Sequence, residues 1–187
     1  MRIVSGHHRG RRIATPDGRN TRPTSDQTRE SLFNIIDHAD WAPDLDGAHV
    51  LDVFSGSGGL GLEALSRGAA FCLFAESHPK ALSAIRQNID HFGLDSDVAR
   101  IHRHDATRLK LAPANVPQLF THVFMDPPYR KNLYQPVLRR LPRYLADDAV
   151  VMIEESVDVE IKVSGWSVLE QRIWGSAQVL FIKLDKN

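Results

Sequence analysis

The stretch LDVFSGSGGLGLEAL, residues 51–65, decides the fold. A short apolar run leads into Gly56, Gly58 and Gly61, which have the G-x-G-x-x-G spacing, and helix-forming residues follow them. Glycines in such a loop let the chain turn sharply and bring backbone N–H groups close to a ligand at the amino end of the helix. The spacing alone is a weak signal, but its place between a strand and a helix predicts a cofactor-binding loop.

Strand-like and helical runs alternate after this loop. The expected strands are residues 71–76, 98–102, 121–126 and 149–155. We expect a helix over 77–93, capped by Ser77, and a helix over about 132–145 that breaks at its second proline. This alternation predicts a Rossmann-like α/β fold with a mostly parallel seven-stranded sheet. Two further runs, 166–174 and 178–184, predict an antiparallel C-terminal hairpin.

The residues before the glycine loop differ from those after it in predicted structure and in charge. Two short runs, 2–6 and 10–16, predict a small β-hairpin, and Thr24 or the serine after it is expected to cap an amphipathic helix. Residues 1–30 carry seven arginines against three acidic residues, although the net charge of the whole chain is zero. Arginine grips phosphate with two donors, so this basic arm predicts nucleic-acid binding, and a solvated charged surface is the competing interpretation.

The composition restricts the cross-links, metal sites and cellular location that we expect. The chain of 187 residues has one cysteine, Cys72, so neither a disulfide nor a four-cysteine metal site can form within it. His102 and His104 share one side of a strand, but no third ligand stands at a recognisable spacing, so no metal is expected. No segment approaches the length of a membrane span, and we expect a cytoplasmic monomer.

Acidic residues end three successive strands of the predicted sheet. Asp52 would repel a pyrophosphate but attract an ammonium or sulfonium group. Glu76 stands 20 residues after Gly56, where an acid can hold ribose hydroxyls, and Asp105 could accept a hydrogen bond from an adenine amino group. Together they favour S-adenosylmethionine over a nicotinamide cofactor. Each acid alone is weak evidence, because acids at strand ends often cap the next helix.

The segment DPPY, Asp126 to Tyr129, follows the fourth strand. Pro127 holds Asp126 in an extended conformation, and neither proline has an N–H, so the segment presents mainly acceptors. An exocyclic amine of a nucleobase could donate to the Asp126 carboxylate and the Pro127 carbonyl while Tyr129 stacks on the base. The pattern predicts in-line methyl transfer to such an amine, and a proline-rich turn with an exposed tyrosine is the alternative.

Five segments of the chain resemble, in their order and spacing, the RsmD family of class I S-adenosylmethionine-dependent methyltransferases. They are RIVSGHHRGRRI, TRPTSDQTRESLFNII, LDVFSGSGGLGLEALSRGA, FMDPPY and WGSAQVLF. That family methylates the exocyclic N2 amine of a guanine in 16S ribosomal RNA of the small (30S) subunit. The resemblance implies the same substrate, with an RNA-binding arm over residues 1–40 ahead of a methyltransferase domain over residues 41–187.

The resemblance also implies roles for individual positions. The target base would contact Asp126, Pro127, Pro128 and Tyr129. The cofactor would contact Asp52, Phe54, Ser55, Gly56, Ser57, Gly58, Glu76, Ser77, Asp105, Ala106 and Asp126. RNA would contact Arg9, Arg11, Arg12, Arg22, Thr24 and Arg29. Three other functions stay open: methylation of adenine N6 or cytosine N4, a nicotinamide-dependent oxidoreductase with the same glycine loop, and a non-catalytic RNA-binding module.

Overall fold

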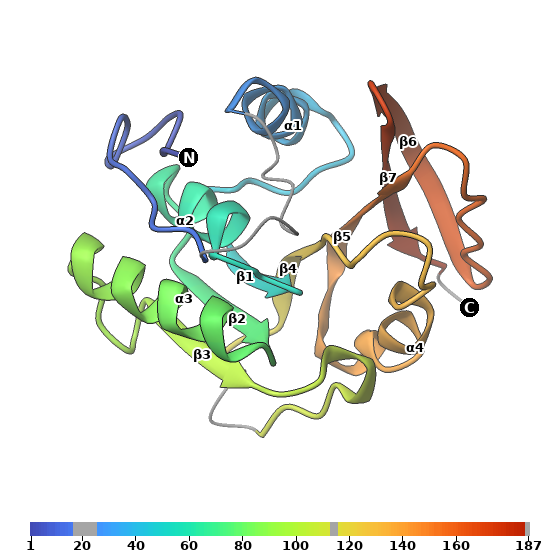
Figure 1. Cartoon of the computed structure of the whole chain (residues 1–187). Coiled ribbons are helices and arrows are strands. Elements are labelled where there is room, and N and C mark those ends of the chain that lie inside the picture. The colour runs from blue at the N-terminus through green and yellow to red at the C-terminus, as the bar shows by residue number, and fades with distance from the viewer. Residues whose placement is uncertain (17–25, 113–115, 186–187) are drawn as a thin grey trace.

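The computed structural model describes residues 1–16, 26–112 and 116–185. Its helices are α1 (Asp26–His38), α2 (Gly59–Ser66), α3 (Pro79–Phe92) and α4 (Tyr134–Leu138), with 3₁₀ turns η1 (Ala106–Arg108) and η3 (Leu141–Tyr144). Its strands are β1 (His49–Val53), β2 (Phe71–Glu76), β3 (Ala99–Arg103), β4 (Phe120–Met125), β5 (Leu145–Ser156), β6 (Trp166–Trp174) and β7 (Ala177–Leu184). Figure 1 shows these strands as a twisted sheet with helices around it.

The seven strands of the described residues form one sheet in the order β3-β2-β1-β4-β5-β7-β6. β1 to β5 run parallel, and β7 pairs antiparallel with both β5 and β6. The prediction of a mostly parallel Rossmann-like sheet with a C-terminal antiparallel hairpin is therefore confirmed. The chain runs from β1 outward to β3 and then returns to β4 on the other side of β1, so the strand order reverses between β1 and β4.

Helices cover both faces of the sheet (Figure 1). On one face, α1, α2 and α3 bury side chains such as Phe33, Leu62 and Ile85 against strand residues that include Phe124. On the other face, α4 and the 3₁₀ turns bury side chains such as Val137 against the strands. The sheet is thus apolar on both sides, as expected for central parallel strands.

One buried carboxylate docks the amino-terminal residues on α2. Glu63 accepts hydrogen bonds from the backbone N–H groups of Val4 (2.8 Å) and Ser5 (3.0 Å). The predicted hairpin is present as a single antiparallel bridge between Arg2 and Arg12, because the Arg11 N–H next to the bridge donates to the His8 carbonyl within the turn (3.1 Å). The residue predicted to cap α1 lies outside the described residues.

Two predicted helices have different boundaries in the structure. α3 begins at Pro79 with His78 at its N-cap, so the prediction that Ser77 caps this helix is wrong. Its end is as predicted, because Gly93 follows it in the left-handed conformation with φ of 69°. The helix predicted over 132–145 consists of two short pieces, α4 and η3, with a proline in the first turn of η3.

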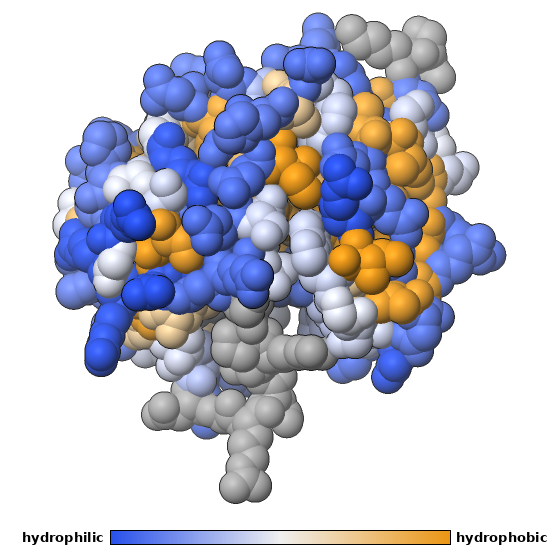
Figure 2. Space-filling model, turned by 90° about the horizontal axis from the view of Figure 1, so that it is seen from above, coloured by the Kyte–Doolittle hydropathy of each residue, from blue (hydrophilic) through white to orange (hydrophobic). Residues whose placement is uncertain are grey.

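β6 forms one edge of the sheet and carries exposed apolar side chains. Val168 is 54% exposed and Ile173 is 62% exposed. Figure 2 shows hydrophobic groups on the side of the molecule where β6 and β7 lie in Figure 1. Charged side chains interrupt this edge, since Glu170 and Arg172 form an ion pair of 2.6 Å between the two apolar residues.

Candidate active site

Three carboxylates face the same side of the sheet around the point where the strand order reverses. Met125 of β4 lies beside Ile153 of β5, so the next residues, Asp126 and Glu154, lie level with each other at the carboxyl ends of these strands. Side chains alternate along a strand, and this places Asp126, Glu154 and Asp52 of β1 on the face covered by α1, α2 and α3. Sheets of this type bind ligands in the crevice at such a reversal point.

The glycine loop turns the chain from β1 into α2. Gly58 stands at the N-cap of α2 with φ of 81°, a left-handed conformation that favours glycine, and its N–H donates to the carbonyl of Ser55 (2.7 Å). Gly61 has a different role, because a Cβ there would lie 2.5 Å from the Cys72 sulfur on β2. The third glycine therefore allows close packing of α2 on the sheet, which brings the amino end of α2 to the site.

Two other loop residues connect the loop with its surroundings. Phe54 adopts a left-handed φ of 61°, and its partly buried ring packs against the core on the α4 face. The carbonyl of Ser57 accepts a hydrogen bond from the side-chain amide of Asn88 on α3 (2.9 Å). The same amide group bonds to the carbonyl (3.0 Å) and the N–H (2.7 Å) of Ala14, so a single side chain ties the amino-terminal segment to the loop.

Asp52 is buried beneath the loop. Its side chain is 2% exposed and accepts a hydrogen bond from the Gly61 N–H (3.0 Å). Burial raises the pKa of this carboxyl to about 7, and the charge of Glu76 adds to the rise, while the bond from Gly61 opposes it. Such a carboxyl is stabilised in its ionised form by a positively charged ligand. Asp52 therefore suits a cationic cofactor.

Glu76 organises the backbone at the carboxyl end of β2. One oxygen accepts from the N–H of Gly56 (2.9 Å), and the other accepts from the N–H groups of Ser77 (2.7 Å) and His78 (2.8 Å). The acid at this predicted site position thus links the glycine loop to the start of α3. Ser77 contributes its backbone N–H to that arrangement.

Asp105 caps the 3₁₀ turn after β3. It accepts hydrogen bonds from the backbone N–H (3.0 Å) and the hydroxyl (2.8 Å) of Thr107. The side-chain bond from Thr107 is the largest cause that keeps the pKa of this half-exposed carboxyl below its usual range. Ala106 follows it and is buried. Asp105 thus caps the turn that follows its strand, which is the alternative role of an acid at a strand end. It lies near Glu76, because β2 and β3 are paired in parallel and end side by side.

The DPPY segment begins directly after β4. Burial raises the pKa of Asp126 well above its usual range, and the charges of Glu154, Asp52 and Glu155 raise it further. Pro127 is buried and Pro128 is exposed. The hydroxyl of Tyr129 donates a hydrogen bond to Glu154, a contact that fixes the tyrosine ring beside the site.

The end of β5 contributes two acids that were not among the predicted site residues. Glu154 is 6% exposed and accepts the bond from Tyr129, and Glu155 is fully buried and accepts two bonds from the Arg130 N–H (3.0 and 3.1 Å). Arg130 itself has a left-handed φ of 64°, so Glu155 holds the turn that follows the DPPY segment. Two acids directly after a run of apolar strand residues were the available signal, because buried acids usually have specific partners.

The predicted RNA-binding arginines differ in their surroundings. Arg9 and Arg12 are exposed, whereas the guanidinium of Arg11 lies 4.6 Å from the centre of the Phe92 ring. The side chain of Arg29 is 1% exposed and pairs with Asp26 (2.9 Å) and with Glu63 (3.6 Å). A buried arginine cannot contact RNA in this conformation, so the prediction for Arg29 is corrected. The other two positions, Arg22 and Thr24, lie outside the described residues.

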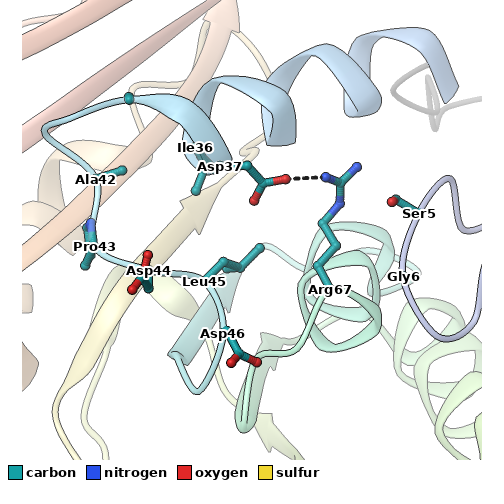
Figure 3. A pocket seen from close by; sticks show the side chains of 11 residues that line it. Ser5, Gly6, Ile36, Asp37, Ala42, Pro43, Asp44, Leu45, Asp46 and Arg67 are labelled. Carbon is teal, nitrogen blue, oxygen red and sulfur yellow. Dashed lines mark hydrogen bonds and ion pairs between the residues drawn. The ribbon is translucent and has the colours of Figure 1, made fainter.

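A separate hollow lies at the other end of the strands from the glycine loop (Figure 3). It has a volume of about 390 Å³ and lies between α1, the segment before β1 and the end of α2. Arg67 and Asp37 face each other across part of it in an ion pair of 2.6 Å. Because these segments precede β1 and β2, the hollow lies at the amino ends of the strands, away from the carboxyl edge where sheets of this type bind ligands.

The described residues contain neither a metal cluster nor a membrane span. Histidine, cysteine and acidic side chains do not gather there in any group of three or more that could hold a metal ion. In the same part of the chain, no helix has the length and apolarity needed to cross a bilayer.

Comparisons with known proteins place the chain in a family. Residues 1–183 match the family model described as "Conserved hypothetical protein 95". The chain is 37% identical over 163 residues to the Bacillus subtilis protein "Putative rRNA methyltransferase YlbH", with 86% of this chain and 85% of the relative covered. It is 35% identical over 179 residues to the Escherichia coli protein "Ribosomal RNA small subunit methyltransferase D", with 94% and 85% covered.

The fold agrees with these similarities. A solved Escherichia coli structure, "Putative methyltransferase yhhF", superposes with a TM-score of 0.79 at 29% identity and covers 99% of this chain and 98% of its own. The glycine loop, the DPPY segment and the point where the strand order reverses lie together at the carboxyl ends of the strands. The chain belongs to the RsmD family of methyltransferases, and its cofactor is S-adenosylmethionine.

Proposed function

We propose that this protein methylates the exocyclic N2 amine of a guanine in 16S ribosomal RNA of the small subunit. The observation that carries the proposal is the position of Asp126 and Pro127 directly after β4, beside the glycine loop that follows β1. An acceptor segment at this point faces the cofactor crevice. The names of the relatives support small-subunit ribosomal RNA as the substrate, and the family resemblance supports guanine N2.

The chain's own residues would bind and orient the amine. The Asp126 carboxylate and the Pro127 carbonyl accept its two hydrogens, which directs the nitrogen along a defined line. Tyr129 stacks on the base, and its bond to Glu154 keeps the ring in place. Positioning of this kind provides most of the rate in a direct transfer between two bound reactants.

The proton of the amine leaves late in the reaction. The nitrogen becomes acidic only when it has been methylated, so a strong base is not required. Asp126 nevertheless suits the role of proton acceptor, because a carboxyl whose pKa is raised by burial holds a proton better than an exposed aspartate does.

The cofactor-binding residues surround the glycine loop. S-adenosylmethionine supplies an activated methyl group when it is bound, and it carries positive charges at its sulfonium and ammonium groups beside one negative carboxylate. The buried carboxyl of Asp52 and the partly buried carboxyl of Asp126 fit these charges, since both have raised pKa values that a cation would lower. The other predicted contacts of the cofactor are Phe54, Ser55, Gly56, Ser57, Gly58, Glu76, Ser77, Asp105 and Ala106, with Glu76 at the ribose and Asp105 at the adenine.

In this proposal the amino-terminal arm and the rest of the chain have different roles in substrate binding. Residues 1–40 form the RNA-binding arm in this proposal and residues 41–187 the methyltransferase domain. Arg9, Arg11, Arg12, Arg22 and Thr24 would contact RNA, while Arg29 supports the arm from inside. The substrate would be the 30S subunit or an assembly intermediate in the cytoplasm, and the protein would act as a monomer.

Nucleoside analysis tests the proposal directly. Purified protein is incubated with S-adenosylmethionine and with small subunits that lack the modification, and the digested RNA is analysed by mass spectrometry. We expect N2-methylguanosine from the wild type and almost none from Asp126→Asn, while Asp97→Asn, whose side chain is 90% exposed, keeps full activity. Methylated adenosine or cytidine in its place would refute the guanine assignment, and an unchanged product yield from Asp126→Asn would refute the role of the DPPY segment.

A further inference from the structure

Glu154 lies beside Asp126, where it can contact the ring nitrogen next to the reacting amine of the target base. Asp126 and Glu154 are level with each other on adjacent parallel strands and face the same side of the sheet. Adjacent strands are about 4.8 Å apart, which allows two carboxylates to contact neighbouring atoms of one planar base. Tyr129, the expected stacking residue, is bonded to the same Glu154 carboxylate.

The chemistry of the three amine-bearing bases differs at that neighbouring atom. In guanine, the N2 amine is next to N1–H, so two donors stand side by side. In adenine and cytosine, the amine is next to a ring nitrogen that is an acceptor. A carboxylate at this place would therefore attract guanine and repel the other two bases.

We propose that Glu154 determines specificity for guanine by accepting a hydrogen bond from its N1–H while Asp126 and Pro127 hold the N2 amine. This inference rests on the proposed function and adds the means by which the enzyme selects the base. A carboxylate offers about four acceptor positions, so the bond from the Tyr129 hydroxyl is compatible with a second bond to the base. The tyrosine bond also holds the carboxylate beside the expected stacking residue.

The burial of Glu154 strengthens this discrimination. Its side chain is 6% exposed, so water competes weakly for the carboxylate. A site that is built to bond a substrate donor discriminates against an analogue without that donor, because the complex with the analogue lacks this hydrogen bond. A hydrogen bond to a charged group of this kind corresponds to a discrimination of about 10-fold to 100-fold.

A cycle of two enzymes and two substrates tests the inference. The substrates are an RNA fragment that spans the methylated nucleotide, made with either guanosine or 2-aminopurine riboside at that position. 2-Aminopurine keeps the reacting N2 amine and lacks N1–H. The enzymes are the wild type and Glu154→Gln, whose amide oxygen can still accept the bond from Tyr129.

We expect the wild type to prefer guanosine over 2-aminopurine in kcat/KM by at least about 10-fold and Glu154→Gln to lose most of that preference. The cycle removes effects that both enzymes share, such as recognition of the guanine O6. Glu160→Gln is the matched control, because its side chain is 80% exposed in the loop after β5, and it should keep the wild-type preference. Binding of S-adenosylhomocysteine, measured by calorimetry, shows that each variant is folded.

The outcomes separate this inference from the function on which it rests. If the wild type forms no N2-methylguanosine, the proposed function fails. If it forms that product but methylates both substrates equally well, only the reading of N1–H fails. An unchanged preference in Glu154→Gln would also overturn the inference, since Asp126 would then read both donors of guanine without help from β5.

Discussion

We expect Asp52 to couple cofactor affinity to pH. Its buried carboxyl has a pKa of about 7, far above that of an exposed aspartate. A positively charged ligand binds the ionised form better, which lowers this pKa and releases a proton on binding. The affinity for S-adenosylmethionine should therefore rise with pH across the neutral range.

The size of the effect follows from the pKa. With a pKa of about 7, roughly one Asp52 carboxyl in eleven is ionised at pH 6 and about ten in eleven at pH 8. If only the ionised form contributes, the dissociation constant at pH 6 is about tenfold higher than at pH 8, or about 1.4 kcal/mol. The raised pKa of Asp126 acts in the same direction.

Isothermal titration calorimetry at several pH values measures this dependence. Repeating the titration in two buffers with different ionisation enthalpies counts the protons released. Asp52→Asn can still accept the bond from Gly61 but cannot ionise, so its affinity should be weak and should change little between pH 6 and pH 8. Asp97→Asn is the control on an exposed loop and also accounts for titration of the ligand itself. Equal pH slopes for the wild type and Asp52→Asn would refute the reasoning.

Further predictions concern packing, the arm and a buried histidine. Gly61→Ala would place a Cβ 2.5 Å from the Cys72 sulfur, so chemical denaturation should show a loss of about 1–3 kcal/mol. Arg29→Met leaves Glu63 without one buried partner and should cost about 3 kcal/mol in the same assay, while the salt dependence of RNA binding stays unchanged. Burial lowers the pKa of His122 to about 4, so the unfolded chain binds a proton below pH 6.5 that the folded protein excludes. Stability should fall by up to about 3 kcal/mol between pH 6.5 and pH 4, and His122→Asn should remove this component.

The local signals of the sequence predict the strands and the positions of the glycine loop and the DPPY segment at strand ends, because each signal depends on a few adjacent residues. The contacts that correct the predictions join distant residues. The basic arm and the family resemblance predict an RNA contact for Arg29, but the fold brings it to Glu63, 34 positions later, inside the protein. The same carboxylate accepts hydrogen bonds from the N–H groups of Val4 and Ser5, so it also joins the amino-terminal segment to α2.

The acids at the carboxyl ends of the strands fall into two sets, and Asp52 belongs to both. Along β1, β2 and β3, Asp52, Glu76 and Asp105 end successive strands, and the last two are engaged with backbone groups that shape the cofactor loop and the turn after β3. Along β1, β4 and β5, Asp52, Asp126 and Glu154 face one side of the sheet. The first set lies where an adenosine would bind and the second where an amine would be held. In the proposed site the positive sulfonium would lie between the two sets, where the buried carboxyl of Asp52 and the partly buried carboxyl of Asp126 have pKa values that a cation would lower. Charge complementarity would thus bring the methyl donor and the target amine to the same point of the sheet.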